Sequence, residues 1–249
     1  MPLCRCAPVR SALLFGFVAA LANLAGAFVV ARSAKLGLRV IELFVAFSAG
    51  FMLALALASA VPEALERGHG DAALVILLGY LLVHLSQHTM TPHFHFGEET
   101  HQVSRRAGQA ALLGLLLHTF FDGVAIASGF LVSRELGLLF FLAIALHKLP
   151  EGVTVSSLTI ASGGSAARGY LAAAYLGIAT LLGVVLTDVA GVLREHGLAL
   201  SAGVTIYVGA SNLVPEFQGK KGARLPLAFF AGAGAFLLAR AVLGSVAGS

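Results

Sequence analysis

His118-Thr119-Phe120-Phe121-Asp122-Gly123 and His147-Lys148-Leu149-Pro150-Glu151-Gly152 each lie in the middle of a long apolar run. Each stretch carries a histidine and a carboxylate four residues apart, and on a helix this spacing places both side chains on one face. A histidine and an acid on one wall of a membrane helix form half of a metal site. Two such helices that face each other would therefore form a whole one.

The charged side chains of these two stretches need partners if the runs cross a bilayer. An ionisable residue at the bilayer centre costs roughly 2.5–3.5 kcal/mol, so Asp122, Lys148 and Glu151 would together cost on the order of 8–10 kcal/mol if unpaired. A structural ion pair of Lys148 with one acid would leave the other acid and both histidines without a partner. A divalent cation between the helices accounts for all of them, and imidazole with carboxylate suits zinc and similar metals.

The composition predicts an all-α polytopic membrane protein. Of the 249 residues, 58% are hydrophobic and only 11% are charged, against about 25% charged in soluble domains. No polar stretch is long enough to hold a soluble core, so residues 1–249 are expected to form a single transmembrane domain. The pI near 9.4 is explained by basic loops beside membrane spans, without nucleic acid as a partner. Cys4 and Cys6 are too few for a disulfide framework.

The apolar runs predict about eight transmembrane helices, because about 20 residues are needed to cross a bilayer. Polar loops are expected at residues 63–71 and 194–196, and Pro150 is expected to kink the fifth span and interrupt its backbone. The expected spans cover residues 11–31, 40–61, 72–90, 108–132, 136–160, 169–192, 198–217 and 225–243.

Charge bias predicts the orientation of these spans. The loops after the first, third, fifth and seventh spans carry more lysine and arginine than the opposite side, so these loops should face the cytoplasm and both termini the outside. Outer acids, with Asp188 among them, would attract cations to an entrance. The loop at 91–107 should then lie inside, and histidines in and before it are expected to receive metal at the exit: His84, His88, His93, His95 and His101.

Taken together, these features resemble the ZIP (Zrt/Irt-like protein) metal-ion transporters over essentially the whole chain. The motifs at 118–123 and 147–152 carry the resemblance, and residues 49–52, 61–63 and 213–216 also look familial. Members of that family carry zinc, iron, manganese or cadmium toward the cytoplasm. The resemblance implies a transport site built from His118, Asp122, His147 and Glu151, with Met52 as a candidate soft ligand from the second span.

Three departures from the family pattern imply a single-metal site. Many bacterial relatives carry Asn after the fourth-span histidine, Asp or Asn after the fifth-span histidine, and a sixth-span Glu, and these hold a second metal. A gapless alignment puts Thr119, Lys148 and Gly183 at those positions. Hydroxyl is a poor ligand, glycine has no side chain, and an ammonium group repels a dication. We therefore expect Lys148 to pair with Asp122 or Glu151 where a second metal would lie.

The expected function is transport of a divalent transition metal into the cytoplasm by alternating access, in the lipid bilayer of the inner or plasma membrane. The expected cargo is Zn2+, with Fe2+, Mn2+ and Cd2+ as alternatives; no cofactor is expected, and a homodimer is compatible with the sequence. Binding to His118 and His147 requires neutral imidazole, so uptake should weaken at acid pH. The rival functions are an intramembrane metal-dependent hydrolase and a passive metal-binding protein.

Overall fold

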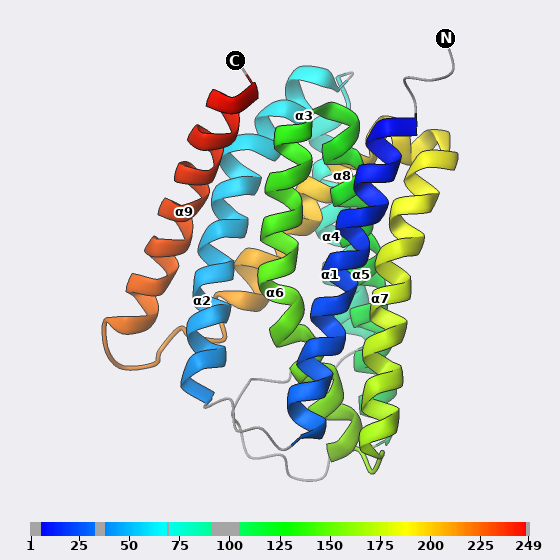
Figure 1. Ribbon diagram of the computed structural model, residues 1–249, viewed down its shortest axis with the longest axis vertical. Helices are drawn as coiled ribbons and strands as arrows, with labels where there is room; N and C mark the ends of the chain where they lie inside the picture. Colours follow the sequence, from blue (N-terminus) through cyan, green and yellow to red (C-terminus); the bar gives the residue numbers. More distant parts are fainter. Residues whose placement is uncertain (1–5, 33–37, 69, 91–104, 248–249) are drawn as a thin grey trace.

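The computed structural model describes residues 6–32, 38–68, 70–90 and 105–247, and these residues form helices without any strand. Three pieces join end to end into the second rod of the bundle, and α8 continues into η2, so the described chain forms eight rods (Figure 1). The helices, with π-helical segments labelled η, are α1 (Cys6–Ala31), α2 (Leu38–Leu55), η1 (Ala56–Ala60), α3 (Val61–Arg67), α4 (Ala72–Met90), α5 (Arg105–Val132), α6 (Arg134–Ala161), α7 (Ala166–Val189), α8 (Gly191–Tyr207), η2 (Val208–Leu213) and α9 (Arg224–Ala247).

These helices confirm the prediction of an all-α polytopic membrane protein. Six of the described helices are long and apolar enough to cross a bilayer, and Ala72–Gln87 forms a shorter apolar helix. Large apolar side chains such as Leu74, Leu238 and Val192 are exposed on the outside of the bundle, where lipid would solvate them. The start of α1 and the end of α9 lie at the same end of the bundle (Figure 1), as an even number of spans requires.

Two predicted loops are wrong, because polar residues at helix ends remain helical. The second rod continues to Arg67, whose guanidinium bonds Glu63 one turn earlier, so the predicted loop at 63–71 is much shorter. Residues 194–196 lie inside α8, and the turn is at Ala190, where Arg194 bonds the carbonyl and carboxylate of Asp188. The loop expected at 91–107 also ends earlier, since α5 begins at Arg105.

The predicted break of the backbone at Pro150 is not observed, whereas the kink expected there stays a prediction. The helix α6 runs from Arg134 to Ala161 with Pro150 inside it. The irregular backbone is in η1 and η2 instead, each directly before a Val-Pro-Glu sequence at 61–63 or 214–216. Val61 N–H bonds Ala56 O and Val214 N–H bonds Gly209 O, a five-residue step that widens the turn before each proline. Such π-helical segments are rare in proteins, and those that occur are often at functional sites.

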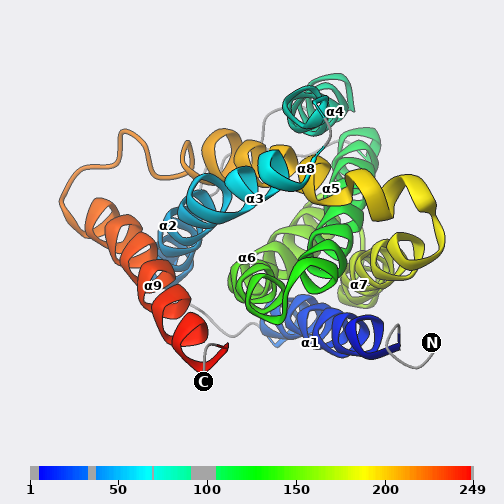
Figure 2. The ribbon, with the colours of Figure 1, turned by 90° about the horizontal axis from the view of Figure 1, so that it is seen from above.

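The rods divide into two groups in the end-on view (Figure 2). One group contains α1, α5, α6 and α7, which pack closely on one another; in the other, α2 packs on α9 and α4 packs on α8. Glycines make the close approaches: a Cβ on Gly26 of α1 would lie 2.3 Å from Leu149 O of α6. Small residues at helix contacts are what packing within lipid requires. The candidate site lies on α5 and α6, within the first group.

Candidate metal centre

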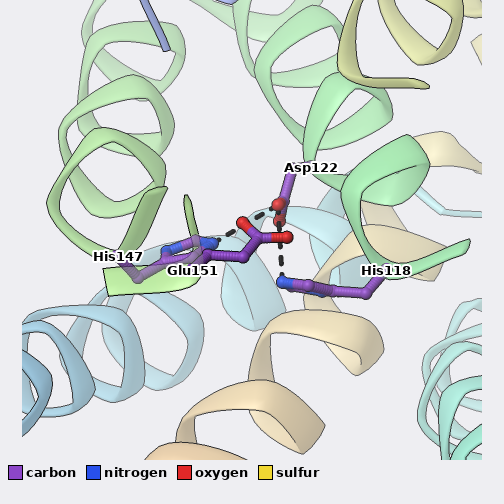
Figure 3. A group of neighbouring side chains, drawn as sticks. All are labelled: His118, Asp122, His147 and Glu151. Carbon is purple, nitrogen blue, oxygen red and sulfur yellow. Dashed lines mark hydrogen bonds and ion pairs between the residues drawn. The ribbon is translucent and has the colours of Figure 1, made fainter. Parts of the chain in front are cut away.

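Four buried side chains from α5 and α6 converge at one point (Figure 3). His118 and Asp122 come from α5, and His147 and Glu151 come from α6. Each offers one ligand atom, and these four atoms all lie within 4.8 Å of one another. The relative exposure of the four residues is 4% for the two histidines and Asp122 and 8% for Glu151. The structure therefore brings together the four residues that the spacing of the two motifs predicted.

Asp122 Oδ2 lies at the centre of the group. It is 3.3 Å from His147 Nε2 and 3.5 Å from His118 Nε2, so both imidazoles direct the same ring nitrogen toward it. His147 Nδ1 lies 3.0 Å from Ala143 O, a contact in which Nδ1–H donates to the carbonyl. That hydrogen bond leaves the Nε2 lone pair for a metal, which is the usual arrangement of a histidine ligand.

Lys148 contacts both carboxylates of the group. Its Nζ lies 2.7 Å from Asp122 Oδ2 and 2.7 Å from Glu151 Oε2, and the residue is fully buried. The sequence predicts a pair with one acid or the other, whereas the ammonium bridges both. An ammonium group has three donors, and a buried one is stable only when its donors are satisfied.

Thr119 and Gly183 each have a structural role at positions where the family resemblance would imply ligands of a second metal. The Thr119 hydroxyl donates to Leu115 O in its own helix and lies 3.3 Å from Glu151 Oε1. Gly183 of α7 lies against the backbone of α5, where an added Cβ would be 2.0 Å from Phe120 O. No side chain fits at Gly183 without separating α5 from α7, so a ligand at that position is excluded by the packing.

The other candidate residues lie apart from the four or outside the described part. Met52 is buried in the apolar core on α2, and its role as a ligand stays a prediction. Asp188 borders a small hollow with residues of α1 and α5, and its carboxylate is paired with Arg194. His84 packs against Tyr80 and Tyr207 between α4 and α8. The predictions for His93, His95, His101 and Cys4, and for the side chains of His88 and Cys6, fall outside the described residues.

One buried polar residue of the interior, Asn23, is not among the residues predicted from the sequence. Asn23 of α1 is fully buried, and neither its Oδ1 nor its Nδ2 has a hydrogen-bond partner in the described structure. The available signal was an amide side chain in the middle of the first apolar run, because polar residues within a membrane span are rare and usually functional.

The chain matches a protein family and several of its members. The family model described as ZIP Zinc transporter matches residues 87–240. The chain is 30% identical over 167 residues to "Zinc transporter GufA" of Myxococcus xanthus, which covers 61% of this chain and 66% of that protein. It is 28% identical over 171 residues to "Zinc transporter ZIP9" of Micropogonias undulatus, covering 62% and 54%. The matches thus span less than two thirds of the length of these two relatives.

Proposed function

Because the chain belongs to the ZIP zinc transporter family, we propose that it carries a divalent transition metal across a membrane. The proposed cargo is Zn2+, with Fe2+, Mn2+ and Cd2+ as further candidates, and the relatives above are named as zinc transporters. The proposed site consists of His118, Asp122, His147 and Glu151. The observation that carries the proposal is the convergence of their four buried ligand atoms within 4.8 Å.

The donor set suits a transported dication. Two imidazole nitrogens and two carboxylates match the ligands that zinc uses in proteins, and the carboxylates offset the charge that a bilayer interior disfavours. The four groups meet near the middle of α5 and of α6. A cation there would exchange its water for protein ligands at mid-membrane, where transporters commonly bind their substrates.

The proposed site holds one metal ion. Lys148 places an ammonium 2.7 Å from each carboxylate, which supplies a fixed positive charge beside the proposed ligands. Gly183 is closed to any side chain by α5, and the Thr119 hydroxyl proton is donated to Leu115 O. Elemental analysis of the purified protein should therefore find one tightly bound zinc ion per chain. Two such ions per chain would contradict the single-metal site while leaving transport itself untouched.

The proposed direction is inward, with both termini outside and the cell membrane as the location. It is supported by the excess of lysine and arginine in the loops after the first, third, fifth and seventh spans. The start of α1 and the end of α9 lie at one end of the bundle, as two termini on one side require. Alternating access would open the site first to one side and then to the other. The intramembrane hydrolase is set aside, because ZIP family members are transporters.

Uptake of radiolabelled Zn2+ into proteoliposomes tests the proposal. Replacing His118, Asp122, His147 or Glu151 by Ala should abolish saturable uptake, because each removes one of the converging ligands. Thr159→Ala is the matched control on α6, since its hydroxyl donates to Val155 O two turns beyond Glu151, and it should transport at the wild-type rate. Wild-type rates in the four ligand variants would refute the site. A protein that binds zinc without moving it would favour the passive binder.

A further inference from the structure

Asn23 of α1 carries a buried amide that belongs to neither motif. It is fully buried, and both polar atoms of its amide lack a partner in the described structure. An unpaired amide is costly in an interior that excludes water. Such a group is retained when another arrangement of the protein, or a ligand, provides its partner.

The neighbours of Asn23 on α1 show the direction in which it faces. Three residues earlier, Ala20 contacts α7, where a Cβ on Gly177 would be 3.0 Å from the Ala20 Cβ. Three residues later, Gly26 contacts Leu149 O of α6. Since about 3.6 residues make a turn, Asn23 lies midway between these two contact lines. Its side chain therefore faces the wedge between α6 and α7.

Asn23 also lies at the depth of the metal site. A Cβ on Gly152 of α6 would be 2.1 Å from the Asn23 carbonyl oxygen, and Gly152 directly follows Glu151. Lys148 precedes Gly152 by four residues, about 40° around the helix axis. The side chain of Lys148 therefore leaves α6 on the flank between the metal site and Asn23.

Lys148 occupies the atoms that a metal ion would use. Its ammonium is bound to Asp122 Oδ2, the same oxygen that faces both histidine Nε2 atoms, and to Glu151 Oε2. A dication entering between these atoms repels the ammonium and competes for the same lone pairs. Lys148 must then move, and within the bilayer it needs another acceptor.

We propose that Asn23 is the residue to which Lys148 moves when a dication binds, with Oδ1 accepting from the ammonium. This inference rests on the proposed function. Asn23 is then a positioning residue: it holds the Lys148 ammonium while the metal ion occupies the site that the ammonium has left. The other unpaired buried side-chain atoms of the described chain do not suit this role. Ser128 faces Gly197 of α8, Ser201 lies on α8, and His118 Nδ1 belongs to a ligand.

A double-mutant cycle with Lys148 tests the inference. Asn23→Leu keeps the size of the side chain and removes the acceptor, and Lys148→Met removes the ammonium. We expect Asn23→Leu to weaken Zn2+ affinity about tenfold in the wild-type background and less than about twofold in the Lys148→Met background, as for residues in direct contact. Zn2+ affinity is measured by chelator competition on purified protein. Ser128→Ala, which removes a buried unpaired hydroxyl facing α8, is the control and should change affinity less than about twofold.

Each outcome of the cycle decides the matter. If Asn23→Leu weakens Zn2+ affinity equally in both backgrounds, Asn23 only packs or holds water. If it does not weaken Zn2+ affinity in the wild-type background, Lys148 does not need Asn23. Either result overturns the inference and leaves the proposed transport site standing. Absence of Zn2+ binding by the wild-type protein would overturn both. Asn23→Ala, measured in the same cycle, replaces Asn23→Leu if the leucine variant does not fold.

Discussion

Lys148 sets the charge balance of the proposed metal centre. With Asp122 and Glu151 charged and both histidines neutral, the group carries one net negative charge, and a bound dication makes it one net positive charge. Without Lys148 the same ligands would carry two negative charges and would hold a dication in a neutral cluster. A transport site must bind its ion weakly enough to release it. We therefore expect the ammonium to favour turnover over affinity.

Lys148→Met should tighten Zn2+ binding by roughly tenfold or more, because two unit charges 4 Å apart interact by about 4 kcal/mol at an effective dielectric of 20. The same variant should transport Zn2+ more slowly, because release of the ion from the site becomes rate-limiting. Zn2+ affinity by chelator competition and maximal uptake rate in proteoliposomes measure the two effects. Unchanged or weaker affinity would show that the ammonium does not oppose the metal.

At the residue scale, the sequence predicts the four proposed ligands and a contact of Lys148 with one acid, but neither its second contact nor Asn23. The four-residue spacing of His118 with Asp122, and of His147 with Glu151, places each pair on one face of its helix. The meeting of the two pairs follows once α5 and α6 pack with these faces together. The double contact of Lys148 depends on the rotamer that its long side chain adopts between two helices. The burial of Asn23 depends on which helices pack against α1. Neither is determined by spacing within one helix.

At the scale of whole helices, the contact between α5 and α7 sets the position of α5, which carries His118 and Asp122. A Cβ on Gly123 would lie 1.9 Å from Thr180 O, and a Cβ on Gly183 would lie 2.0 Å from Phe120 O. The two glycines thus let each backbone rest directly on the other. Gly123 directly follows Asp122, so this contact also sets the position of a proposed ligand.

Gly183→Ala should destabilise the protein by about 1–3 kcal/mol, the usual cost of overpacking a close contact. It should also lower Zn2+ uptake, because α5 must move away from α7 and take Asp122 with it. Gly234→Ala on α9 is the matched control, since nothing lies within 4 Å of a Cβ there and it is exposed. Thermal unfolding in detergent measures the difference, and equal midpoints for the two variants would contradict the packing argument.

The sequence predicted the helices better than their ends and irregularities. Apolar length alone identifies a membrane span, which explains why the eight rods agree with the expected eight spans. The continuation of α3 to Arg67 and the start of α8 before Arg194 depend on side-chain bonds with Glu63 and Asp188. The widened turns of η1 and η2 depend on how the chain accommodates Pro62 and Pro215, whereas α6 accommodates Pro150 without an interruption.

At the scale of the whole molecule, all four proposed ligands belong to one group of helices. The α1, α5, α6 and α7 group is held together by close glycine contacts, and it meets the other group mainly where α5 contacts α8 and where α6 contacts α2 (Figure 2). A relative shift of the two groups would therefore carry the site as a unit, without separating His118 and Asp122 from His147 and Glu151. We expect access to alternate by such a shift.

A disulfide between the two groups should stop transport, because it would fix α5 to α8. Ser128→Cys with Gly197→Cys is suitable: a Cβ on Gly197 lies 3.7 Å from the Ser128 Cβ, and disulfides need about 3.5–4.5 Å. Ser156→Cys with Gly169→Cys on α6 and α7 is the control within one group; its Cβ atoms would be 3.2 Å apart, so a shift of a few tenths of an ångström brings them into that range. Both pairs are made with Cys4 and Cys6 replaced by Ser.

Oxidation should abolish Zn2+ uptake only in the pair that joins α5 to α8, and reduction should restore it. The site itself would stay assembled under the crosslink, so Zn2+ affinity should persist while uptake is lost. That separation of binding from movement distinguishes a blocked shift from a damaged site. Full uptake with the α5–α8 disulfide formed would mean that the metal passes through a static bundle, and loss of uptake in both pairs would place the required motion within the ligand-bearing group.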